Sequence, residues 1–156
     1  MRKPNNRELY AWAFGVASAV GSKNRCIRLS VGCVLLDKHG RILATGHNGP
    51  PRKIPNCSVE SCPGANVLEV GRGLGTCRAA HAEINALIQC ANISKVRTVV
   101  VTAFPCFDCL KALLNSGMKT LVYGGDYPRA PDGLRLLDIR GIVGVRFEDL
   151  QKEVNQ

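Results

Sequence analysis

Short apolar, strand-like runs alternate with helical segments along most of the chain, and this alternation constrains the fold most. The first two runs, 31–36 and 42–46, flank the turn-forming residues 37–40, which predicts a β-hairpin. Three further strands are predicted at 98–102, 120–123 and 142–147. Helices are predicted between them at 78–90, 106–115 and 132–140. Strands that alternate with helices are typical of an α/β protein, so we expect a parallel or mixed sheet.

The amino-terminal segment resembles either a weak export signal or the first helix of the fold. Arg2, Lys3 and Arg7 precede a mildly apolar stretch from Leu9 to Val20, as in a signal peptide. Glu8 interrupts the basic region, however, and the apolar residues recur at helical spacing: Leu9, Trp12, Ala13, Val16, Ala17 and Val20. We expect this helix to pack on the core, and the protein to be cytoplasmic with its cysteines reduced.

The length of 156 residues predicts a single domain, 1–156, with a loop insertion at about 47–77 that carries cysteines. The chain contains no 18-residue apolar run, so we expect no membrane span. A net charge of +9 favours an anionic partner: nucleic acid, a nucleotide phosphate or an acidic surface. Charge alone does not choose among these three.

Two short motifs supply potential zinc ligands at the starts of two predicted helices. His81 begins one helix, and Cys106 and Cys109 lie three residues apart at the start of the next. A helix amino terminus favours the thiolate form of cysteine. Two thiolates and one imidazole would leave the fourth tetrahedral position of Zn²⁺ open to water, as in catalytic zinc sites.

Glu83 lies two residues after His81, where it could reach a water molecule on such a metal and shuttle protons. The alternative for each motif alone is structural. Cys106 and Cys109 could be buried thiols, His81 a capping residue and Glu83 a solvated side chain.

Together, H-x-E and P-C-x-x-C resemble the signature of the zinc-dependent cytidine and deoxycytidylate deaminase superfamily. Within it, residues 7–127 are most similar to the deoxycytidylate (dCMP) deaminases. The segments that carry this similarity are 22–28 before Val31-Gly32, Asn48-Gly49-Pro50-Pro51, 105–109 and 121–127. His47 replaces the usual Tyr of the family, and Arg52-Lys53 stands where small residues are commoner.

The resemblance implies a cytidine-deaminase-like three-layer α/β/α sandwich with a central mixed five-stranded sheet. It also implies hydrolysis of dCMP to dUMP and ammonia, which supplies dUMP for thymidylate synthesis. In that reaction a zinc-bound hydroxide attacks carbon 4 of cytosine, and Glu83 carries the protons.

Three substrate contacts are carried over from the family. Asn48 is expected to bind the sugar hydroxyl, Arg28 the phosphate, and Tyr127 the region near the base and phosphate. The alternatives are a turn residue for Asn48, an ordinary surface arginine for Arg28 and a packing residue for Tyr127.

The remaining cysteines divide into two groups. Cys33 and Cys90 are expected to be core thiols. A second, structural zinc occurs in some deoxycytidylate deaminases, and Cys26 and Cys57 align with it. Cys62 and Cys77 complete a Cys₄ set by their chemistry, and such a metal would order the long loop.

The resemblance also implies a homo-oligomer, with a hexamer favoured, and possible regulation by dCTP and dTTP. The main rival function is deamination of nucleic acid, either tRNA or single-stranded DNA, which the sequence disfavours. A 5-modified cytosine nucleotide remains an alternative substrate. A catalytically inactive zinc module is another rival, and the presence of Glu83 argues against it.

Overall fold

The computed structural model describes residues 6–63, 77–125 and 130–152. A five-stranded mixed sheet forms its centre, in the order β2-β1-β3-β4-β5. The strands are β1 (Gly32–Leu36), β2 (Ile42–His47), β3 (Thr98–Val101), β4 (Thr120–Tyr123) and β5 (Val143–Arg146). Strand β1 is antiparallel to both β2 and β3, whereas β3, β4 and β5 run parallel. The predicted strands and the mixed sheet are confirmed.

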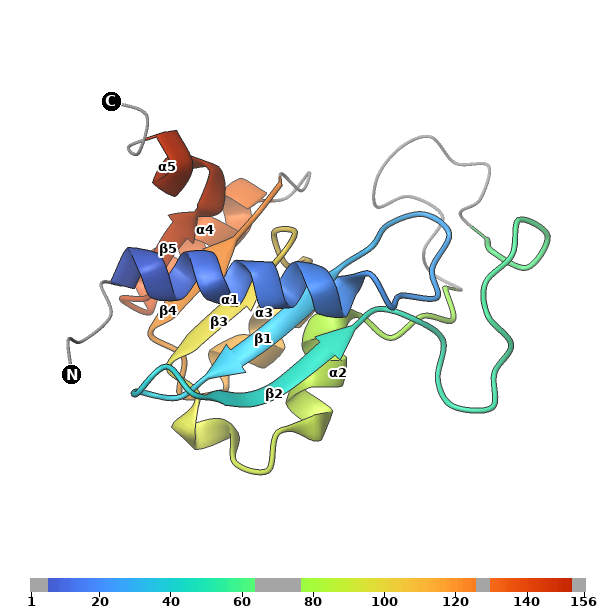
Figure 1. The fold of residues 1–156 in the computed structure, drawn as a ribbon, viewed down its shortest axis with the longest axis horizontal. Helices are drawn as coiled ribbons and strands as arrows, with labels where there is room; N and C mark the ends of the chain where they lie inside the picture. The colour runs from blue at the N-terminus through green and yellow to red at the C-terminus, as the bar shows by residue number, and fades with distance from the viewer. Residues whose placement is uncertain (1–5, 64–76, 126–129, 153–156) are drawn as a thin grey trace.

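Helices cover both faces of this sheet, so the predicted three-layer α/β/α architecture is confirmed (Figure 1). One face carries α1 (Asn6–Gly21) and α5 (Phe147–Lys152). The other carries α2 (Ala82–Gln89), α3 (Phe107–Leu114) and α4 (Ala130–Ile139). A short 3₁₀ helix, η1 (Ile93–Lys95), precedes β3.

The central strands are buried on both sides because successive side chains point to opposite faces. In β1, Cys33 and Leu35 join the core beneath α2, α3 and α4, whereas Val34 and Leu36 join the core beneath α1. This double burial explains why β1 is a continuous apolar run rather than an alternating one. Cys33 is fully buried and Cys90 packs against the first core, as predicted for both thiols.

The apolar residues that share one helical face around α2, Ala80, Ile84, Leu87 and Ile88, do not all face the core. Leu87 packs against it, but Ile88 is 75% exposed. The buried residues of α2 are instead Ala82, Glu83 and Ala86.

The reason is the close approach of α2 to the backbone of β2. A Cβ atom on Gly46 would lie 2.2 Å from the carbonyl oxygen of Ala82 and 2.4 Å from the nitrogen of Ala86. Only small side chains fit at this contact, so the helix turns its alanines rather than its isoleucines toward the sheet.

Other boundaries also differ from the prediction. Helix α2 begins at Ala82 rather than near residue 78, and α4 begins at Ala130 rather than at residue 132. Helix α5 and η1 were not predicted. On α1, Trp12 is half exposed, although the helical stripe placed it toward the core. Within the described ranges, no helix has both the length and the apolarity that a bilayer crossing requires.

Candidate active site

The amino termini of α2 and α3 position the three predicted metal ligands. His81 is the N-cap of α2, has an extended backbone and makes no side-chain capping bond, so its imidazole is free to face α3. Cys106 is the N-cap of α3, and its sulfur accepts a hydrogen bond from the backbone nitrogen of Cys109 at 3.4 Å. The local structure of each helix start therefore places a donor atom at the same point.

The distances among these donors suit a tetrahedral zinc ion. Nδ1 of His81 lies 3.4 Å from Sγ of Cys106 and 3.3 Å from Sγ of Cys109. Zinc bonds of about 2.3 Å to sulfur and about 2.0 Å to nitrogen would separate these atoms by about 3.5 Å. Among the residues that the structure describes, this is the one group of three or more such side chains with all donor atoms within 4.8 Å.

The electrostatics of the group favour a thiolate at Cys106. Hydrogen bonds from Cys109 and His81 lower the pKa of Cys106 to about 4, although burial opposes them. The hydrogen bond to Cys106, together with burial, raises the pKa of Cys109. The bond to Cys106 also raises the pKa of His81. Because zinc requires both sulfurs as thiolates and a neutral imidazole, metal binding would displace protons from Cys109 and His81.

Glu83 lies in the first turn of α2 and is 4% exposed. Burial raises the pKa of its carboxyl group, while its own backbone amide and the imidazole of His81 act in the opposite direction. A raised pKa makes the carboxyl group easier to protonate, which suits a group that must take up a proton and pass it on.

A cavity of about 340 Å³ opens over these residues. His81, Glu83 and Cys106 line it, as do Arg28 and Asn48. Its size falls within the range of small-molecule sites. Glu83 is the one carboxylate among the described residues that line it.

Comparison with protein families gives a direct match to this arrangement. The profile described as the cytidine and deoxycytidylate deaminase zinc-binding region matches residues 7–125. The chain belongs to the cytidine and deoxycytidylate deaminase family.

Individual relatives agree with this assignment. A deoxycytidylate deaminase of Mycobacterium phage D29 is 35% identical over 130 residues, which cover 79% of this chain and 97% of the relative. A deoxycytidylate deaminase of Saccharomyces cerevisiae is 31% identical and matches 85% of this chain. The chain spans about two fifths of the length of that protein and of its Schizosaccharomyces pombe counterpart.

Among solved structures, a dCMP deaminase of cyanophage S-TIM5 in complex with dCMP and dUMP superposes with a TM-score of 0.70. It is 30% identical, and the match covers 94% of this chain and 99% of that one. The predicted cytidine-deaminase-like fold is therefore confirmed.

The side chain of Asn48 forms two hydrogen bonds with the backbone of the segment before β1. Its side chain is 7% exposed, and its Oδ1 accepts a hydrogen bond from the backbone nitrogen of Val31 at 2.9 Å. Its Nδ2 donates to the carbonyl oxygen of Leu29 at 2.7 Å. These bonds fix the segment that leads from Arg28 into β1, along one wall of the cavity. Tyr127, the third predicted substrate contact, lies outside the described residues.

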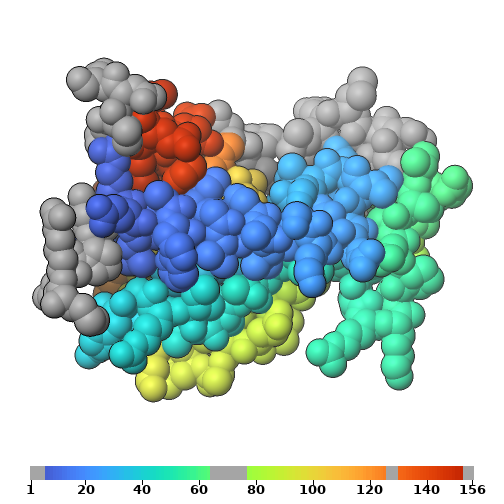
Figure 2. All heavy atoms as spheres, viewed as in Figure 1, coloured from blue at the N-terminus to red at the C-terminus, as the bar shows by residue number. Residues whose placement is uncertain are grey.

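The four cysteines predicted to bind a second zinc all line the same cavity: Cys26, Cys57, Cys62 and Cys77. Burial raises the pKa of Cys57, and the other three thiols raise it further, so the four lie near one another. No three of them bring their sulfurs within 4.8 Å of one another. The loop of Cys57 and Cys62 forms the green protrusion at the right of Figure 2.

Sequence reasoning missed Thr102, Phe104 and Gly125, which also line the cavity. They follow β3 and β4 at the carboxyl ends of these parallel strands. Phe104 packs edge-on against Tyr123 at a centroid distance of 4.8 Å. Their position in the sequence, directly after predicted strands, could have identified them, because ligands of α/β proteins bind at the carboxyl ends of the strands.

Proposed function

We propose that this chain is a zinc-dependent hydrolase that converts dCMP to dUMP and ammonia, and that it supplies dUMP for thymidylate synthesis. The observation that carries the proposal is one cavity lined by His81, Cys106 and the buried carboxyl group of Glu83. Cys109 lies at zinc-ligand spacing from His81 and Cys106 and completes the donor set. The relatives named deoxycytidylate deaminase support the choice of nucleotide.

A zinc ion held by His81, Cys106 and Cys109 would supply a Lewis acid that lowers the pKa of water toward neutrality. Glu83 performs the proton transfers. Its carboxylate oxygen takes a proton from the attacking water and delivers it to ring nitrogen 3 of cytosine. As water oxygen bonds to carbon 4, the double bond between that carbon and nitrogen 3 opens and nitrogen 3 takes the proton. The bond from carbon 4 to the amino nitrogen breaks in the next step, as the new hydroxyl loses its proton to Glu83 and becomes the carbonyl group of uracil. Glu83 passes the second proton to the departing nitrogen, which leaves as ammonia.

The substrate contacts follow from the same cavity. We assign the phosphate to Arg28, because a guanidinium matches phosphate oxygens with two parallel hydrogen bonds. We assign the sugar hydroxyl to Asn48, whose Oδ1 keeps a second lone pair and whose Nδ2 keeps a second hydrogen beyond their backbone bonds. Both residues line the cavity with Glu83.

We also propose a second, structural zinc bound by Cys26, Cys57, Cys62 and Cys77. Two observations support it: the four thiols are near enough to affect the pKa of Cys57, and the sulfur of Cys26 accepts a hydrogen bond from the backbone nitrogen of Arg28 at 3.5 Å. Binding requires the sulfurs to move closer together, since ligands of one tetrahedral zinc lie about 3.8 Å apart. The metal would thereby order the loop.

The assembly proposed from the family resemblance is a homo-oligomer, with a hexamer favoured, that responds to dCTP and dTTP. Two exposed apolar side chains, Val143 on the edge strand β5 and Ile139 at the end of α4, support association between copies. Native mass spectrometry with and without each triphosphate measures both the oligomer size and its response.

The function is tested by assaying dCMP, CMP, dCTP and deoxycytidine side by side for release of ammonia. We expect dCMP to give the highest kcat/KM. Faster deamination of a 5-modified dCMP, of tRNA or of a single-stranded oligonucleotide would replace dCMP as the substrate. Release of ammonia from none of them by the zinc-loaded protein would refute the hydrolase function.

A further inference from the structure

The junction after β4 forms part of the cavity wall and has an unusual backbone. Gly125 lines the cavity, and its φ of +60° lies in the left-handed region. Glycine populates other backbone regions almost as readily, so its own conformational preference does not hold it there. A further contact is needed to keep this part of the wall in one conformation.

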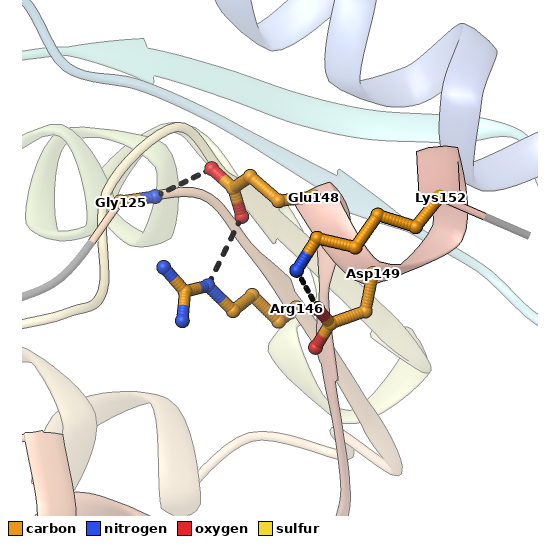
Figure 3. Close-up of polar contacts among 5 residues, drawn as sticks. All are labelled: Gly125, Arg146, Glu148, Asp149 and Lys152. Carbon is orange, nitrogen blue, oxygen red and sulfur yellow. Dashed lines mark hydrogen bonds and ion pairs between the residues drawn. The ribbon is translucent and has the colours of Figure 1, made fainter.

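That contact comes from α5, the helix that directly follows β5 in the chain. Oε1 of Glu148 accepts a hydrogen bond from the backbone nitrogen of Gly125 at 3.0 Å (Figure 3). Its Oε2 pairs with Nε of Arg146 at 3.4 Å. Arg146 is the last residue of β5 and is in register with Tyr123 of β4. The carboxylate thus connects the ends of two neighbouring parallel strands.

Helix α5 packs against α1, and these contacts hold the backbone of Glu148 in place. The ring of Phe147 stacks on that of Phe14 with centroids 3.8 Å apart and planes within 5°. A guanidinium nitrogen of Arg7 donates a hydrogen bond to the carbonyl oxygen of Leu150. These contacts position the carboxylate before any ligand enters the cavity.

Glu148 is suited to act as an acceptor at neutral pH. Burial would raise the pKa of its carboxyl group, but the Gly125 amide, its own amide and Arg146 together bring the pKa below its ordinary value. The group is therefore charged, and a charged acceptor forms the stronger hydrogen bond.

We propose that Glu148 is a positioning residue for nucleotide binding, which acts by holding Gly125 in the conformation that completes the cavity wall. The inference rests on the proposed function, because it takes dCMP as the nucleotide. Without Glu148, Gly125 samples other conformations, and the binding-competent fraction of the protein falls. The apparent dissociation constant rises in inverse proportion to that fraction. Glu148 does not touch the reacting atoms, so turnover of bound substrate stays the same.

The first test compares three variants of α5. Glu148→Ala should raise KM for dCMP about threefold to fivefold with kcat unchanged, which is the upper part of the range for an exposed ion pair. Glu148→Gln should stay within about twofold of wild type, because its amide oxygen can still accept from Gly125. Asp149→Ala is the matched control. It removes a carboxylate from the same helix, whose partner Lys152 lies 3.2 Å away on the surface, and should leave KM unchanged.

A second test asks whether Glu148 acts through Gly125. A Cβ atom at position 125 would have only one other heavy atom within 4 Å, the Thr102 oxygen at 4.0 Å, so Gly125→Ala introduces backbone strain without a clash. It should raise KM as well, and the effects of Glu148→Ala and Gly125→Ala should not add in the double variant. The Gly125 amide proton should exchange faster with solvent in Glu148→Ala than in wild type or in Asp149→Ala.

The outcomes separate the two proposals. If the wild type deaminates dCMP but Glu148→Ala leaves KM unchanged, the positioning role is wrong. It is also wrong if Glu148→Gln is as impaired as Glu148→Ala, if Asp149→Ala has the same effect, or if kcat falls together with the thermal midpoint. A wild type that does not deaminate dCMP refutes the proposed function instead. Amide exchange then still decides whether Glu148 holds Gly125.

Discussion

Replacing Glu83 by glutamine should abolish turnover while leaving the fold and the metal site intact. Glutamine has nearly the same shape as glutamate and can keep the hydrogen bonds of this 4% exposed side chain, but its amide cannot carry protons. Neither His81 nor the two cysteines is altered, so zinc content should equal that of the wild type.

The expected loss of kcat lies toward the upper end of the range for general acid–base catalysis, about 10² to 10⁴. That range corresponds to about 2.7 to 5.4 kcal/mol of activation free energy. Two observations place Glu83 near the upper end. It is the one carboxylate among the described residues that line the cavity, and its burial limits replacement by solvent.

The assay measures kcat with saturating dCMP, zinc per chain by metal analysis and the thermal midpoint. Glu8→Gln is the control, since Glu8 is an exposed residue in the first turn of α1. We expect this control to have wild-type kcat. A Glu83→Gln protein that holds its zinc and keeps more than about a tenth of the wild-type kcat would refute the proton-transfer role.

Three further predictions use other parts of the molecule. Arg28→Ala should raise KM for dCMP by about tenfold or more but scarcely change KM for deoxycytidine, because a charged contact to phosphate contributes about 1.5 to 3 kcal/mol; equal effects on both would remove Arg28 from the phosphate site. Wild-type protein should hold about two zinc ions per chain, and Cys57→Ser should lower the content by about one and increase protease cleavage of the loop; one zinc per chain in active, reduced wild type would rule out the second site. Asp37→Ala should lower the free energy of unfolding by about 1 kcal/mol, since Oδ1 accepts bonds from the backbone nitrogens of His39 and Arg41 at 2.8 and 2.9 Å. The hydrogen bond from the backbone of Arg41 is the main cause that lowers the pKa of Asp37. The charged carboxylate therefore stabilises the fold above its unfolded pKa of about 3.9, and this stabilisation is lost as the pH falls through the lower folded pKa. A difference between wild type and Asp37→Ala in urea unfolding that stays constant from pH 7 to pH 2 would contradict this.

The strands and the metal-ligand cluster could be predicted because both are encoded locally. The five strands are short apolar runs bounded by turn residues, and no strand end differs from its predicted position by more than one residue. Cys106 and Cys109 share one helix start, and the family motif indicates that His81 joins them. The roles of Arg28 and Asn48 stay predictions, although the structure places both at the cavity.

The features that sequence reasoning missed depend on contacts between distant residues. Hydropathy favoured Ile88 as a buried residue of α2, but the spacing to Gly46 of β2 decided which face lies inward. Helix α5 is short and polar, and it is held by the stacking of Phe147 on Phe14, which is far away in the sequence. No periodicity within one segment encodes such pairings.

The close approach at Gly46 has a consequence for how this chain can diverge or be engineered. Gly46 is not among the residues that line the cavity, and it has no side chain to offer chemistry. Even alanine there would place a carbon 2.2 Å from the carbonyl oxygen of Ala82, directly before Glu83. The helix would have to move away and carry that carboxyl group with it. In a saturation library selected for activity, position 46 should therefore be as intolerant as a catalytic position, purely because of backbone spacing.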